Sequence, residues 1–263
     1  MDIDIGFWLT LALAITLIIW AADRVLALRK RGGPVGNAVE TSNSLISVLF
    51  IVLVIRSFIV EPFTIPSGSM LPTLRVNDFI LVNKFSYGLR LPVTNRLIVP
   101  IGEPQRGEIM VFKYPQNRQQ NFIKRVVGLP GDEVAIENNV LSVNGEPVER
   151  QLVERLEGRG GWREERIEVL DGRAYTVWHE GRIQHFTGEH LVQEHTQGRW
   201  TVPEGYYFTI GDNRDNSNDS RFWGMVSEEL IVGKAFMIWM HWQPVFSLPS
   251  FTRNGAIDKV TVN

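Results

Sequence analysis

The chain has 263 residues and no cysteine. This absence excludes disulfide bonds, thiolate nucleophiles and cysteine-ligated zinc, and it leaves the redox state of the compartment undetermined. An excess of either charge is missing as well, because 27 Lys and Arg residues are balanced by 29 Asp and Glu residues. Nucleic-acid-binding proteins usually present a basic surface, so the composition does not support a nucleic acid as partner.

Charge is also absent from a long segment near the N-terminus. Residues 5–22 form an uncharged run of eighteen residues, and a helix needs about 17 to 25 residues to cross a bilayer. A cleavable signal peptide is the alternative, but such a peptide starts with basic residues, whereas Asp2 and Asp4 precede this run. A second apolar segment, at about 42–60, carries only Arg56, and its alternative is a helix buried in a protein core.

The two segments predict a membrane anchor of residues 1–60, with antiparallel transmembrane helices joined by a short loop. That loop is predicted from residues that do not continue a helix, namely Gly32, Gly33, Pro34 and Gly36. The basic residues around it are Arg24, Arg29, Lys30 and Arg31. Because basic loops stay in the cytoplasm, everything after about residue 61 is expected outside it, which in a bacterium is the periplasmic or outer side of the inner membrane.

Beyond residue 61 the pattern changes to short runs rich in Val, Ile and Phe, separated by Gly, Pro, Asn and Asp. Such runs predict β-strands, and examples are 79–82, 108–113, 122–127 and 206–210. Between 134 and 200 the chain is charged and holds four of the five histidines, which we expect to be solvated. We therefore predict a β domain of residues 61–133 and 201–263 with an inserted subdomain, 134–200, whose role the sequence does not indicate.

A candidate nucleophile lies just after the second apolar segment, in the run Ile-Pro-Ser-Gly-Ser-Met of residues 65–70. A glycine between two serines suits a tight turn that exposes a hydroxyl group. A solvated turn is the alternative for this pattern taken alone. Serine is a poor nucleophile near neutral pH without a neighbouring base, so the hypothesis that Ser69 is catalytic depends on finding that base.

Lys124 is the better candidate for the base, because no histidine has a convincing position. His241 lies between tryptophans and is predicted to be a packing or interface residue. Strand alternation puts Lys124 on one face with Phe122 and Val126, while Arg125 points the other way. Apolar burial would lower the lysine pKa from about 10.4 and give a neutral amine. The alternative is an edge-strand lysine whose ammonium group reaches water.

Residues 211–221 are eleven polar residues without an apolar side chain. A calcium-binding loop of the EF-hand type is the obvious alternative, but a loop starting at Asp212 places Arg214 at a ligand position. A start at Asp215 places Ser220 where glycine is required and Val226 where a bidentate glutamate is required. No metal is therefore expected, and the segment predicts a hydrogen-bonded loop that positions other residues.

These segments, behind the two predicted spans, resemble bacterial type I signal peptidases over nearly the whole chain outside the insert. The matching stretches are EPFTIPSGSMLPTL at 61–74, RGEIMVF at 106–112 and IKRVVGLPGD at 123–132. The resemblance implies a mainly β catalytic domain of coiled antiparallel sheets with an inserted β-rich subdomain, anchored by two N-terminal transmembrane helices. It also implies a serine endopeptidase that needs no cofactor.

The resemblance assigns roles to particular residues. Ser69 would attack the scissile carbonyl and neutral Lys124 would take its proton, while the Ser69 N–H and the Ser67 hydroxyl hold the oxyanion. Ser217 would hydrogen-bond the Lys124 amine. Asp219 and Arg221 would form a structural ion pair, and Asp212 is implicated more loosely.

The implied substrates are signal peptides of secreted preproteins, cut after small residues of the Ala-X-Ala type. The residues expected to line the subsites, for which core packing is the alternative, are Phe63, Ile65, Met70, Leu74, Ile80, Val111, Phe122 and Ile123. The peptide is expected to bind in extended form beside residues 63–65. Further expected partners are the lipid bilayer, contacted in part by the aromatic segment 235–242, and the protein translocation machinery. A buried strand is the alternative for that segment.

Two other functions are alternatives for this sequence. A different Ser–Lys peptidase, such as a self-cleaving repressor, needs no pair of spans and lacks the Gly-Asp-Asn-Arg-Asp sequence that begins at Gly211. A membrane-anchored assembly factor without activity is the alternative from another class. The presence of Ser69, Lys124 and Ser217 together argues against it.

Overall fold

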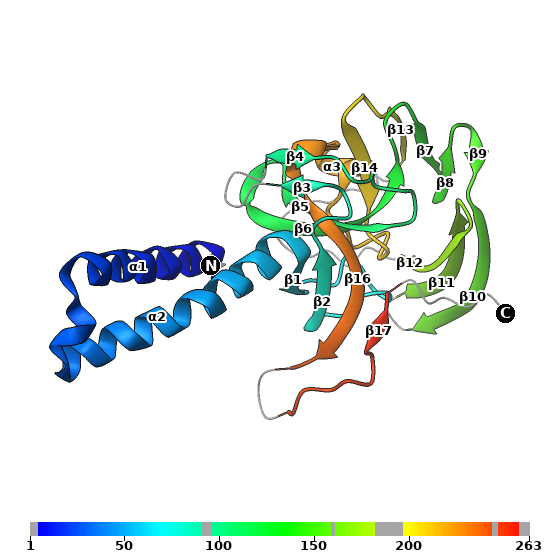
Figure 1. The fold of residues 1–263 in the computed structure, drawn as a ribbon. Helices are drawn as coiled ribbons and strands as arrows, with labels where there is room; N and C mark the ends of the chain where they lie inside the picture. The colour runs from blue at the N-terminus through cyan, green and yellow to red at the C-terminus, as the bar shows by residue number, and fades with distance from the viewer. Residues whose placement is uncertain (1–4, 91–95, 159–160, 182–196, 244–246, 258–263) are drawn as a thin grey trace.

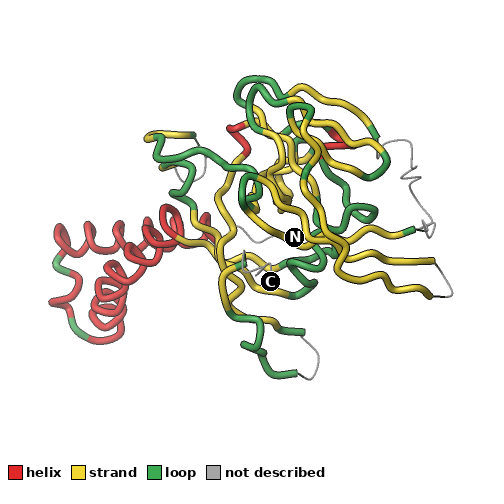
Figure 2. Tube along the Cα trace, turned by 90° about the vertical axis from the view of Figure 1, so that its right-hand side faces the viewer, coloured by secondary structure: helices red, strands yellow, loops and turns green. Residues whose placement is uncertain are grey.

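The computed structural model describes residues 5–90, 96–158, 161–181, 197–243 and 247–257. Two long helices extend from a body built of strands and run antiparallel to each other (Figure 1). Seen from the side, both helices lie on the same side of that body (Figure 2). The mainly β architecture with two N-terminal helices confirms the expected fold class.

The helices α1 (Ile5–Leu26) and α2 (Gly33–Val54) are joined by a short 3₁₀ turn, η1 (Leu28–Arg31), and α2 continues into a π-helical turn, η2 (Ile55–Ile59). Their apolar stretches have mean hydropathies of 1.9 and 2.0 and are only 6% buried within the protein. A helix that exposes apolar side chains on most of its surface suits lipid better than water. The two helices are therefore long and apolar enough to cross a membrane and suggest membrane association.

The second helix starts earlier than predicted, because Gly33, Pro34 and Gly36 belong to α2 and not to the connecting loop. Proline is tolerated in the first helical turn, where its missing N–H group has no carbonyl partner. Gly36 is helical and lies close to η1, since a Cβ atom there would be 3.1 Å from the Arg29 carbonyl oxygen. The glycines and the proline therefore form a tight helix start rather than a longer loop.

One antiparallel sheet carries eight strands in the order β1-β2-β16-β5-β6-β14-β15, with β17 paired to β16. Its strands are β1 (Val60–Thr64), β2 (Asp78–Asn83), β5 (Ile109–Tyr114), β6 (Asn117–Gly128), β14 (Tyr206–Ile210), β15 (Val226–Ser227), β16 (Ile231–His241) and β17 (Gly255–Ala256). The four runs predicted as strands from their composition all lie in this sheet. The aromatic segment at 235–242 likewise lies mostly in a strand, β16.

The strands between Glu133 and Thr201 form two smaller sheets. One contains β10 (Glu149–Gly158), β11 (Gly161–Leu170) and β12 (Arg173–Glu180). The other contains β7 (Glu133–Glu137), β8 (Val140–Val143), β9 (Glu146–Pro147) and β13 (Gly198–Thr201), while a separate hairpin pairs β3 (Leu89–Arg90) with β4 (Leu97–Val99). One buried apolar cluster joins Val134 and Val177 of these smaller sheets to Val127 and Phe208 of the main sheet. The smaller sheets are therefore packed against the main sheet through a shared core.

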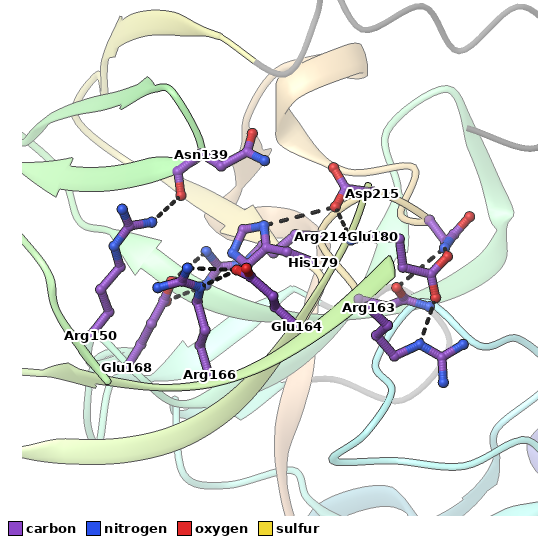
Figure 3. A network of polar contacts seen from close by, with 12 residues as sticks. Asn139, Arg150, Arg163, Glu164, Arg166, Glu168, His179, Glu180, Arg214 and Asp215 are labelled. Atoms are coloured by element: carbon purple, nitrogen blue, oxygen red, sulfur yellow. Dashed lines mark hydrogen bonds and ion pairs between the residues drawn. The ribbon is translucent and has the colours of Figure 1, made fainter. Parts of the chain in front are cut away.

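His179 is buried, contrary to the expectation that the histidines of this region are solvated. It lies on β12, where alternate residues Tyr175, Val177 and His179 face inward, and only 4% of its surface is exposed. Burial, reinforced by nearby arginines that include Arg214, lowers the pKa of His179 to about 3, so the ring is neutral. Its Nδ1 atom is 3.8 Å from an Asp215 oxygen (Figure 3).

The other four histidines are the three between residues 185 and 195, and His241. His185, His190 and His195 lie outside the described residues. His241 is partly buried at the end of β16, and its Nδ1 atom is 2.9 Å from an oxygen of the buried Asp78. That contact agrees with the packing position predicted for His241.

Candidate active site

Ser69 lies in the turn that links β1 to β2. The turn is held by apolar side chains on both sides of the serine, because Ile65, Met70 and Leu74 have exposed fractions of 2%, 1% and 0%. Ser67 stays exposed at the surface, and its Oγ atom is 3.4 Å from Oγ of Ser69. Anchoring by buried neighbours places the Ser69 hydroxyl at the boundary between solvent and core.

Lys124 meets Ser69 from the buried half of β6. Its Nζ atom is 2.7 Å from Ser69 Oγ and 3.0 Å from the Ile123 carbonyl oxygen, and the residue is only 4% exposed. Burial lowers the pKa of Lys124 to about 8, against the opposing effect of Asp219 and Asp212. At pH 7 about a tenth of such amines are neutral, so a proton acceptor is available next to the hydroxyl group.

The residue after Lys124 forms a buried ion pair that the sequence did not indicate. Arg125 Nε and Nη2 lie 2.8 and 2.7 Å from the two carboxylate oxygens of Asp212, and neither side chain exposes more than 2% of its surface. Thr73 Oγ1 donates a hydrogen bond to the same carboxylate. The pair therefore links β6 and the polar loop to the segment that carries Ser69. The signal in the sequence was a second basic residue within the apolar half of β6, where six consecutive residues are buried.

Asp219 and Arg221 form the ion pair expected from the resemblance. Arg221 Nε is 2.8 Å from Asp219 Oδ1, and Asp219 Oδ2 accepts the Gly211 N–H at 3.0 Å. Burial alone would raise the pKa of Asp219, but the Arg221 guanidinium holds it below its usual value. Asp219 therefore stays ionised, caps the short helix α3 (Ser220–Trp223) and closes the polar loop on itself.

Asn213 connects the polar loop, residues 211–221, directly to the turn of residues 65–74 that carries the candidate nucleophile Ser69 (the nucleophile turn). Its backbone N–H donates to the Ser69 carbonyl oxygen and its side-chain amide donates to the Gly68 carbonyl oxygen, both at 3.0 Å. The Ser69 N–H itself donates to no backbone acceptor in the described part of the chain. The carbonyl side of the turn is thus fixed, while the Ser69 N–H remains available to a ligand.

Ser217 does not make the contact expected of it. Among the described residues the Lys124 amine has two hydrogen-bond partners, Ser69 Oγ and the Ile123 carbonyl, and Ser217 is not one of them. Ser217 is 3% exposed, and a Cβ atom on Gly211 would lie 2.2 Å from its Oγ atom. The hydroxyl is therefore packed against Gly211, and the amine is directed by the Ile123 carbonyl.

The residues expected to line substrate pockets fall into two groups. Six of them, with Phe63 packed against them, belong to one buried cluster: Ile65, Met70, Leu74, Ile80, Val111 and Ile123. Phe122 packs on a different cluster and stacks on Tyr114 with ring centroids 4.2 Å apart. Leu74 and Ile80 have no exposed surface, so a ligand reaches them only if neighbouring side chains move. Within the described ranges no three His, Asp or Glu side chains are grouped as a metal site.

Comparison with known proteins gives consistent matches. A sequence profile described as "Signal peptidase, peptidase S26" matches residues 38–242. The chain is 50% identical to signal peptidase I of Pseudomonas aeruginosa over 83% of this chain and 79% of that protein. It is 38% identical to signal peptidase I of Aquifex aeolicus over 73% of this chain and 80% of that protein. A crystal structure of a signal peptidase I from Enterococcus faecalis aligns with a TM-score of 0.32 and 28% identity, over 51% of this chain and 97% of that one.

The buried Lys124 amine should lower the free energy of unfolding, so replacing it with an apolar side chain should stabilise the fold. Below a pH of about 8 the lysine is charged in both folded and unfolded chains, and the folded state bears the desolvation penalty. Lys124→Met should raise the free energy of unfolding at pH 7 by roughly 2 to 3 kcal/mol. As the pH rises from about 8 toward 10.5, the folded lysine loses its proton first and the gain should shrink.

Urea unfolding of the detergent-solubilised chain at pH 7 and at a pH near 10 measures this difference. Lys113→Met on β5, where the lysine is partly exposed, is the matched control and should change stability by less than about 0.5 kcal/mol. Equal effects of the two substitutions would show that burial of the Lys124 amine carries no special cost.

Proposed function

The chain belongs to the signal peptidase I family of serine peptidases, and we propose that it cleaves exported preproteins after small residues of the Ala-X-Ala type by means of a Ser69–Lys124 dyad. The observation that carries this proposal is the 2.7 Å contact between the Ser69 hydroxyl and a buried amine whose pKa is lowered to about 8. A serine beside an amine that is partly neutral has the base that nucleophilic attack requires.

In the proposed reaction the neutral Lys124 amine takes the hydroxyl proton as Ser69 Oγ attacks the scissile carbonyl carbon. Collapse of the tetrahedral intermediate breaks the C–N bond, and the new amino group of the mature protein receives the proton from Lys124. The signal peptide is then held as an ester on Ser69. Lys124 next takes a proton from water as the water oxygen attacks the ester carbon. Cleavage of the bond to Ser69 Oγ then releases the peptide acid, and Oγ takes the proton back from Lys124.

The negative charge of each tetrahedral intermediate would be held by the Ser69 N–H and the Ser67 hydroxyl. The N–H makes no backbone hydrogen bond in the described chain, and Ser67 Oγ lies 3.4 Å from Ser69 Oγ. Loss of one such donor typically costs about 2.7 to 4 kcal/mol of transition-state stabilisation. Asn213 supports this geometry because it holds the carbonyl groups of Gly68 and Ser69 on the opposite side of the turn.

The substrate peptide is expected to bind as an extended strand beside β1. This strand is at the edge of the main sheet, because it pairs with β2 on one side only. An open edge offers backbone groups to an incoming peptide. A preference for small side chains follows from the tight packing of Ile65, Met70 and Leu74 next to Ser69, which leaves little space for a large residue beside the scissile bond.

We also propose that the helices are embedded in the inner membrane, with the β domain outside the cytoplasm. Strand β1 starts at Val60, directly after the π-helical turn that ends at Ile59. Ser69 is nine residues beyond Val60, a contour length of about 30 Å at most. The site would thus stay close to the bilayer surface, where the translocation machinery releases exported chains and where Trp242, 38% exposed, could contact lipid.

Cleavage of a purified preprotein by the full chain tests the dyad. Ser69→Ala and Lys124→Ala should each lower kcat by at least about a thousandfold, because one removes the nucleophile and the other removes its base. Ser142→Ala and Lys113→Ala are the matched controls and should keep normal turnover. Near-normal cleavage by either dyad variant would refute the mechanism and favour a role without Ser–Lys catalysis.

The pH dependence of cleavage provides a separate prediction. Because only the neutral amine accepts a proton, kcat/KM should rise about tenfold per pH unit at low pH and level off above a pH of about 8. Initial rates measured between pH 5 and pH 10 with a short peptide substrate would give this rising limb of the pH profile. A limb centred near pH 6.5 would point to a histidine as base and contradict the assignment of Lys124.

The absence of native cysteine makes topology simple to test, because a single introduced cysteine reports its own accessibility. Thr201→Cys on β13 should react with a membrane-impermeant maleimide in intact spheroplasts. Lys30→Cys in the loop between the helices should react only after lysis. Both residues are exposed, so the reverse labelling pattern would overturn the proposed orientation.

A further inference from the structure

Tyr175 of strand β12 covers the ion pair that follows the proposed base. The Arg125 guanidinium carbon lies 4.0 Å from the centre of the Tyr175 ring, and Tyr175 is only 2% exposed. Burial raises the pKa of the phenol well above 10, so the ring is neutral. A neutral aromatic ring over a guanidinium group attracts the cation and keeps water away from it. The insert thus supplies one wall around the Arg125–Asp212 pair.

The backbone of the same strand holds the polar loop. Trp178 N–H donates to the Asp212 carbonyl oxygen and the Trp178 carbonyl accepts the Arg214 N–H, both at 2.9 Å. These two bonds form a short parallel bridge between Trp178 and Asn213. Since Asn213 also donates to the Ser69 carbonyl oxygen, strand β12 is connected to the nucleophile turn through one intervening residue.

Strand β11 adds a third attachment to the loop. Arg214 donates to both carboxylate oxygens of Glu168, with one of the two distances at 2.8 Å, and the side chains are 5% and 1% exposed. Figure 3 shows this pair beside His179 and Asp215. A buried guanidinium and carboxylate that satisfy each other fix their backbones strongly, because separating them would leave a charge unpaired in the core.

We propose that the β11–β12 part of the insert is a positioning element of the active site, and that the ring of Tyr175 is its positioning residue. The inference rests on the proposed function and adds a role for a region to which the sequence assigned none. The contact of the Tyr175 ring that matters here is with Arg125 and not with Ser69. The ring acts through Arg125, whose partner Asp212 directly precedes Asn213, the residue that donates to the Ser69 carbonyl oxygen.

The effect of the ring on Lys124 has a definite sign. The charged groups that act on the Lys124 amine are Asp219, Asp212 and Arg221, and those around Tyr175 are Glu168, Arg214, Arg125 and Asp212. Without the ring, water would enter and weaken the contact between Arg125 and Asp212. The negative charge of Asp212 would then be neutralised less by Arg125, and the Lys124 amine would be more accessible to water. Both changes favour the ammonium form, so both raise the pKa of Lys124.

The hydroxyl group of Tyr175 supplies an internal control, because it is buried and has no hydrogen-bond partner among the residues that the structure describes. Tyr175→Phe keeps the ring over Arg125 and removes only this unused group. Tyr175→Leu and Tyr175→Met remove the ring and keep an apolar side chain. Tyr206→Leu on β14 removes an exposed tyrosine, 40% exposed, and controls for loss of a tyrosine elsewhere in the β body.

The experiment measures kcat/KM for preprotein cleavage by the full chain in detergent between pH 5 and pH 10. For Tyr175→Leu and Tyr175→Met, the limb should move upward by roughly 0.5 to 1 pH unit, with a three- to tenfold loss of kcat/KM below the limb. Tyr175→Phe and Tyr206→Leu should keep the limb of the parent protein. The folded fraction of each variant, measured by circular dichroism at every pH, is divided out of kcat/KM, so reduced stability alone cannot produce the shift.

Three results would decide against the proposal in different ways. A limb that stays in place in both the Leu and the Met variants would show that the ring does not act on Lys124. An equal shift in Tyr175→Phe would assign the effect to the hydroxyl group instead. Absence of cleavage by the parent protein would refute the proposed function itself, and the positioning role would fall with it.

Discussion

The amine of Lys124 lies in the buried half of β6, 2.7 Å from the Ser69 hydroxyl, and burial lowers its pKa to about 8. An amine in this state destabilises the folded chain by roughly 3 kcal/mol, a large share of a typical net stability of about 5 to 15 kcal/mol. Tight packing around the nucleophile turn offsets the loss, with Met70 and Leu74 almost completely enclosed. The chain can therefore maintain a reactive, destabilising amine only because the β body around it is tightly packed.

Charges near the amine are paired with one another rather than with it. Asp212 is held by Arg125 and Asp219 by Arg221, so neither carboxylate is free to form an ion pair with Lys124 and fix it in the charged form. The same pairs order the polar loop, whose Asn213 holds the nucleophile turn. One arrangement therefore keeps the pKa of the amine low and also fixes the backbone of the turn that carries Ser69.

Local patterns predicted the elements better than the contacts between them. Alternation of residues was sufficient to predict the strand around Lys124 and to place Arg125 on its opposite face. It could not identify the partner of Arg125, since Asp212 is 87 positions further along the chain. The burial of His179 was missed because the charged composition around β12 hid the alternation of Tyr175, Val177 and His179. Ser217 was given a contact by resemblance that the packing against Gly211 does not form.

The direct passage from the π-helical turn at Ile59 into β1 at Val60 leaves no flexible tether between anchor and body. A body on a long linker would sample a large volume and would meet its substrate at a low effective concentration. In the proposed orientation, a body joined without a linker would keep its active site within a thin layer at constant height above the bilayer. For a substrate that is itself held in the membrane, the search becomes lateral and two-dimensional. Under the proposed function, the two helices would then set which peptide bonds reach Ser69 by their distance from the lipid surface.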